Sequence, residues 1–148
     1  MTASVRERIL QNVESTLEAM TTTRWSKVVR ADFYPWAGGP FPLAMVFEPD
    51  DTYRLEQNRG SNTLLSVDMA LDVLCLLQKP GVDKATPMNE AVANVLKALL
   101  TDPTRGGLAI YTDPARVSVS VMDEAQSLAA ARLSFVVHYR HLRTDPSS

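Results

Sequence analysis

The side chains best suited to chemistry are two histidines, His138 and His141, and one cysteine, Cys75. Histidines three residues apart share a face on a helix, where they could bind a metal, but they point to opposite faces of a strand. We expect a strand here, and zinc would also need further ligands. The sequence therefore predicts no metal site. It favours two surface histidines near the chain end and a buried Cys75; a Cys–His catalytic pair is possible but unsupported.

Asp68 and Asp72 are the next candidates, because they fall on one face of a predicted long strand. At strand rise they would lie about 13 Å apart, too far for a pair of catalytic carboxylates in one chain. We favour a solvated sheet face. The alternative is a band of like charge, formed if several copies assemble into a ring.

The glycine-containing stretch Thr104–Leu108 follows a helix rather than a strand, and it lacks the lysine and the spacing of a phosphate-binding loop. We interpret it as a helix-terminating turn. Two small basic clusters are interpreted as solvent-exposed edges rather than as a nucleic-acid site. A net charge of −2 and a pI near 5.6 give no general attraction to nucleic acid. The clusters are Arg24, Lys27 and Arg30, and Arg132, Arg140 and Arg143.

An aromatic segment rich in proline and glycine, residues 32–42, is harder to explain as an ordinary loop. It could fold over an uncovered sheet face and complete the core, or it could be a partner surface. Both hold if the segment is shared between subunits. Its aromatic residues, which we predict to form a protein interface, are Phe33, Tyr34, Trp36 and Phe41.

Two amphipathic helices would position these residues. Ser4 and Glu7 have the spacing of a capping box, and an apolar stripe then recurs every four residues to about Thr21. A second helix is predicted with Thr86 as its cap and Pro87 at its first helical position. We expect it to end at Pro103. Its buried face would be Met88, Val92, Val95, Leu96 and Leu99.

The remaining segments alternate as strands do. A short strand is expected at Lys27–Ala31, and a three-stranded antiparallel meander follows, with Asp50-Asp51 as its first turn and residues 62–78 as its long last strand. Two closing strands contain Val117–Val121 and Leu133–Tyr139. The order predicts an α+β fold: a two-layer sandwich of a mainly antiparallel sheet with both helices packed on one face.

Length and composition limit the remaining possibilities. We expect 148 residues, with 45% apolar side chains, to form a single domain over 1–148, with a frayed polar tail at 144–148. No stretch is apolar enough to span a bilayer. A single cysteine and the absence of a signal-peptide pattern favour a reducing cytoplasm.

Three stretches carry a resemblance to a known family. They are Phe41-Pro-Leu-Ala-Met-Val-Phe47, the helix end Leu99-Leu-Thr-Asp-Pro-Thr-Arg-Gly-Gly107, and Leu133-Ser-Phe-Val-Val-His-Tyr139. Together with the order of elements, they resemble the tail terminator (tail completion) proteins of long-tailed bacteriophages, the minor tail protein U family. The likeness runs from about Val5 to Arg143, whereas the aromatic segment is unusual for that family.

The resemblance implies a homohexameric ring in the virion, assembled in the host cytoplasm. The ring would cap the tail tube protein, stop its polymerisation and meet the head–tail connector proteins. The family has no catalytic residues, cofactor or metal to carry over. Three alternatives stay open: another head–tail connector or neck protein, a non-phage interaction module, and a small enzyme with a site between subunits.

Overall fold

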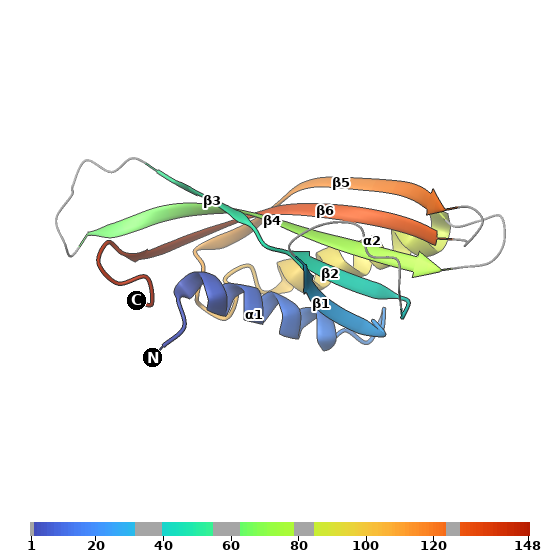
Figure 1. Ribbon diagram of the computed structural model, residues 1–148, viewed down its shortest axis with the longest axis horizontal. Coiled ribbons are helices and arrows are strands. Elements are labelled where there is room, and N and C mark those ends of the chain that lie inside the picture. Colours follow the sequence, from blue (N-terminus) through green and yellow to red (C-terminus); the bar gives the residue numbers. More distant parts are fainter. Residues whose placement is uncertain (1, 32–39, 55–62, 79–84, 124–127) are drawn as a thin grey trace.

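The computed structural model describes residues 2–31, 40–54, 63–78, 85–123 and 128–148. Within them, two helices lie against one face of a mostly antiparallel sheet (Figure 1). This confirms the predicted α+β fold. The outer face of the sheet is the face opposite the helices, and the inner face is the one they cover.

Helix α1, Val5–Glu18, begins as predicted, because the Ser4 hydroxyl accepts a hydrogen bond of 3.1 Å from the Glu7 amide. The Glu7 carboxylate, however, accepts hydrogen bonds from the side chains of Arg30 and Gln11. Five apolar residues of the helix are buried against the sheet. They are Val5, Ile9, Leu10, Val13 and Leu17.

Helix α2, Ala85–Thr101, starts before the predicted cap, so Thr86 lies inside its first turn rather than at its N-cap. Its apolar stripe is otherwise as predicted, with Met88, Val95 and Leu99 almost fully buried. Leu96 is only partly buried and packs at the margin of the core.

The sheet has the strand order β1-β2-β4-β6-β5, and β3 also pairs with β4. Its centre is the antiparallel pair of β4 and β6, which stay in register from Leu64–Leu142 to Gln78–Leu128. The predicted short strand is confirmed as β1, and it runs parallel to β2. The strands are β1 Lys27–Ala31, β2 Leu43–Phe47, β3 Asp50–Tyr53, β4 Leu64–Gln78, β5 Tyr111–Asp123 and β6 Leu128–Leu142.

The predicted meander is wrong in one respect. Strands β2 and β3 do not pair with each other, because both pair with the same edge of β4. Val46 lies opposite Val73 and Asp50 opposite Ala70, so one extra residue is accommodated between the strands. Pro49 sits there without an N–H to donate, which suits an interruption of the ladder. Asp50-Asp51 therefore begins β3 and is not a turn.

Alternation along β4 separates two apolar clusters. Its odd-numbered residues from Val67 to Cys75 join the main core between sheet and helices, as predicted. On the outer face Leu74 and Leu76 are also buried, in a second cluster. That cluster contains Leu43, Met45, Leu74, Leu76 and Ala130, with Val29, Phe41 and Phe47 packed against it.

The last residues, expected to be frayed, are held in place. The Val5 amide donates to the Pro146 carbonyl at 2.9 Å, and the Leu142 amide donates to the Ser148 carbonyl at 2.9 Å. The Asp145 carboxylate accepts hydrogen bonds from Ser147 and Ser148, which closes the turn. Short polar residues form such local hydrogen bonds readily, and composition alone does not reveal them. No helix among the described residues has the length and apolarity to cross a membrane.

Candidate functional surfaces

Most of the polar side chains that could react or bind a ligand lie on the outer face of the sheet. The register of β4 and β6 sets Asp68 opposite His138 and Asp72 opposite Ser134. Because side chains alternate between faces, His138 points outward and His141 points to the inner face. The two histidines are therefore separated, as the strand interpretation predicted.

Asp68 is the centre of a charged cluster. Its carboxylate accepts two hydrogen bonds from Arg54, at 2.8 and 3.2 Å, and lies 2.6 Å from Nδ1 of His138. The other ring nitrogen, Nε2, lies 3.0 Å from Asp113 Oδ2 on β5. Arg54 also lies 3.1 Å from Nδ1, so the His138 ring connects Asp68 of β4 and Asp113 of β5 through its position on β6. The cluster is thus an electrostatic link between strands. Arg54 occupies the side of Asp68 that a bound cation would need.

The pKa of Asp68 is lowered, first by the hydrogen bonds from Arg54 and then by the one with His138. A lowered carboxyl pKa contributes stability that is present above the unfolded pKa of about 3.9 and lost as pH falls through the folded value. We expect Arg54→Ala to move the pKa of Asp68 upward. An NMR titration of the Asp68 carboxyl carbon measures this, with Arg116→Ala as the control. An unchanged Asp68 titration in Arg54→Ala would contradict the assignment.

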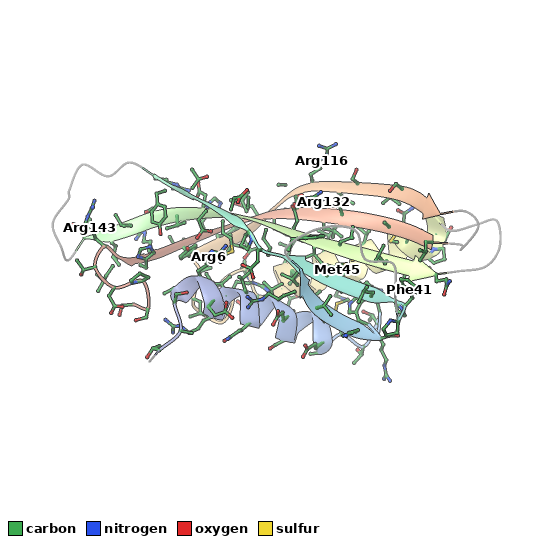
Figure 2. The ribbon with its side chains drawn as sticks, in the orientation of Figure 1. Arg6, Phe41, Met45, Arg116, Arg132 and Arg143 are labelled. Atoms are coloured by element: carbon green, nitrogen blue, oxygen red, sulfur yellow. The ribbon has the colours of Figure 1, made fainter. Side chains whose placement is uncertain are left out.

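Asp72 has a separate partner, because Arg132 donates to its Oδ2 at 2.5 and 3.1 Å. Asp68 and Asp72 are therefore each paired with an arginine. A shallow hollow of about 410 Å³ lies beside this pair, lined by Asp72, Arg116, Ser118, Arg132 and Ser134. Arg116 extends from β5 away from the sheet (Figure 2). The hollow is open and polar, and none of these side chains is placed as an activated nucleophile.

The apolar end of the outer face borders this charged half. The Arg132 guanidinium carbon lies 5.8 Å from the Phe47 ring centroid, a cation–π contact that joins the two. Phe41 is half-buried against the second apolar cluster, to which Met45 belongs (Figure 2). Phe33, Tyr34 and Trp36 lie outside the described residues. The interface role of these four aromatic residues stays a prediction.

A partly buried polar network, not foreseen from the sequence, joins α1, β3 and β6. The Tyr139 hydroxyl donates to Asp51 Oδ2 at 2.7 Å, and Arg6 Nε donates to the same oxygen at 3.1 Å. His141 is 5% exposed, with Nε2 at 2.7 Å from the Tyr53 hydroxyl. The prediction of two surface histidines is wrong for His141, because it occupies a core-facing position of β6. Burial raises the pKa of both tyrosines, so their hydroxyls stay protonated at neutral pH.

The stretch Thr104–Leu108 is a helix-terminating turn, as predicted. The Asp102 carboxylate accepts from the amides of Thr104 and Gly106, and both Gly106 and Gly107 have positive φ. Arg105 is the unexpected member: it is 1% exposed and donates to the carbonyls of Leu99 and Asp102. A buried arginine thus caps the C-terminus of α2.

Arg30 and Cys75, two further candidates, have structural roles. Arg30 bonds to the carboxylates of Glu7, Glu14 and Glu48, so this part of the basic cluster is neutralised. Cys75 is buried, as predicted, and burial raises its pKa to about 12, which keeps the thiol unreactive. Among the described residues no group of three or more His, Cys, Asp or Glu side chains could hold a metal ion.

The fold is similar to that of a chain in a solved structure described as the virion of a native gene transfer agent (GTA) particle. The TM-score is 0.59 at 13% sequence identity, and the match covers 93% of this chain and 96% of that chain. No protein-family profile and no curated protein sequence matches the chain. At this identity the likeness shows a shared fold.

Proposed function

We propose that this chain is a structural protein of a virus-like particle, and that it works by assembly rather than catalysis. The observation that carries the proposal is the match of nearly the whole fold, in both directions, to a chain of a gene transfer agent virion. The site chemistry supports it. The polar side chains that could react are engaged with one another, as Asp68 is with Arg54 and His138.

The finer role that we propose is tail termination. Copies of the chain would form a ring, a hexamer by resemblance, on the end of the tail tube protein. The ring would stop tube polymerisation and offer the surface for the head–tail connector. The three sequence stretches that resemble tail terminator proteins support this role. They include the aromatic–proline entry to β2 and the whole turn after α2.

Purified protein is expected to bind the open end of isolated tail tubes as a ring. Mass measurement by light scattering across a concentration series, with and without tubes, and negative-stain microscopy of tube ends test this. His138→Ala is the matched control, because it removes the outward histidine without changing the core; it should assemble normally. A protein that stays monomeric alone and with tubes contradicts the proposal. A His138→Ala variant that folds but loses function favours the enzyme alternative.

A further inference from the structure

Strand β5 is a free edge of the sheet. Within the described part of the chain it pairs only with β6, and every side chain from Asp113 to Ser120 is exposed. An edge strand presents unpaired N–H and C=O groups along its open side. Figure 1 shows β5 along one margin of the sheet and β1 along the other.

The inner face of β5 carries apolar side chains that the helices do not cover. Val117 and Val119 are 43% and 44% exposed, whereas Leu133 and Ala131, their partners on β6, are fully buried. One strand step therefore leads from the core to solvent. The two exposed valines offer apolar area that a neighbouring surface could bury with a gain in stability.

The devices that usually protect an edge are at the two ends of β5. Register shifts interrupt its pairing between Pro114 and Arg116 and again between Val121 and Asp123. The stretch between them alternates valine and serine in regular pairing with β6. A regularly paired, β-branched edge of this kind is a template for another strand.

The opposite edge, β1, differs from β5 in one important way: its inner face is covered by α1. Arg30 of β1 donates to Glu7 and Glu14 of α1, at 2.7 Å in each case. Val28 packs against the main core, and Val29 packs against the second apolar cluster. Strand β1 therefore carries α1 along its inner face, whereas α2, which also contacts β5, leaves Val117 and Val119 exposed.

We propose that β5 of one copy pairs with β1 of the next, so that sheet and helix layers continue from subunit to subunit. The α1 helix beneath the incoming β1 would then cover Val117 and Val119. Pairing β5 with a second β5 would bring a strand whose own Val117 and Val119 are exposed, which is why the occupant is the β1 edge. Such head-to-tail contacts close into a ring when the rotation per subunit permits. The inference rests on the proposed ring and assigns its contact.

Disulfide cross-linking tests the contact directly. Lys27→Cys on β1 and Ser118→Cys or Ser120→Cys on β5 place exposed thiols on the outer face of both edges. Mild oxidation of the paired variants, in assembled protein, should give a ladder of covalent oligomers. Each single variant is the control and should give dimers at most, because Cys75 is buried. A ring that forms normally but yields no ladder from either pair overturns this contact and leaves the ring proposal standing.

A charge on the exposed valines is the second test. Val119→Lys should weaken self-association roughly tenfold or more while leaving the fold intact, because the side chain is exposed in the single subunit. Leu64→Lys, which changes a side chain that is 47% exposed on a paired central strand, is the matched control and should associate normally. Unchanged association of Val119→Lys overturns the inference. So does a variant that keeps the ring but loses tube binding, since β5 would then serve another partner.

Discussion

Arg105→Ala is expected to lower the free energy of unfolding by about 2–4 kcal/mol, because it leaves several neutral hydrogen-bond acceptors without their donor. The guanidinium donates to the Leu99 and Asp102 carbonyls and, at 3.3 Å, to Asn12 Oδ1 of α1. Burial lowers the pKa of Arg105, but an arginine stays charged. Its charge also suits the negative end of the α2 dipole. Without it, the buried Leu99 carbonyl and the part-buried Asp102 carbonyl lose this donor.

Three further variants separate the causes. Arg105 has a φ of 50°, a conformation that costs a non-glycine residue about 1 kcal/mol or more. Arg105→Gly removes that conformational cost together with the cap. It should therefore lower the free energy of unfolding less than Arg105→Ala does, but still clearly. Arg105→Lys keeps the charge but not the forked donors. Arg116→Ala, on the exposed side of β5, should change stability by less than about 0.5 kcal/mol. Urea melts measure all four, and an unchanged midpoint in Arg105→Ala would refute the capping role.

The helices and most strands could be predicted because their signals are local. The stripe of α1 and the alternation of β4 and β6 each need only neighbouring residues to be recognised. The pairing of β2 and β3 could not be found this way. Asp50-Asp51 has the composition of a turn, and only the partner strand shows that Pro49 marks an interruption in one continuous edge.

The candidate residues divide in the same manner. His141 shares the parity of Phe135 and Tyr139 along β6, so alternation contained the signal for its inward position, although its polarity argued for the surface. The Asp68–His138 contact depends on the register between β4 and β6, which no local pattern sets. Arg105 stands beside two glycines, a context typical of exposed turns. Its burial follows from the packing of α1 against the end of α2.

Asp51→Ala is expected to cost about 2–4 kcal/mol, because it removes the shared acceptor of a partly buried network. Tyr139 is 2% exposed, so in this variant its buried hydroxyl would lose the acceptor that now lies 2.7 Å away. Arg6 would keep its hydrogen bonds to Glu48 and to the Pro49 carbonyl, at 3.2 and 2.5 Å, so it would lose only part of its hydrogen bonding. Asp50→Ala is the matched control: this neighbour on β3 is exposed, and its change should stay within about 0.5 kcal/mol.

A double-mutant cycle identifies the source of that cost. Tyr139→Phe alone leaves Asp51 with Arg6, and should destabilise by about 1–2 kcal/mol. With Asp51→Ala already present, the same change removes a hydroxyl that has lost its acceptor, so its further cost should be near zero or favourable. The coupling between the two residues should then be about 1 kcal/mol or more, as for other groups in direct contact. Urea midpoints of the four proteins give the value. Strictly additive effects would mean that Asp51 stabilises the fold through Arg6 alone, and that the Tyr139 hydrogen bond contributes little to holding β3 against β6.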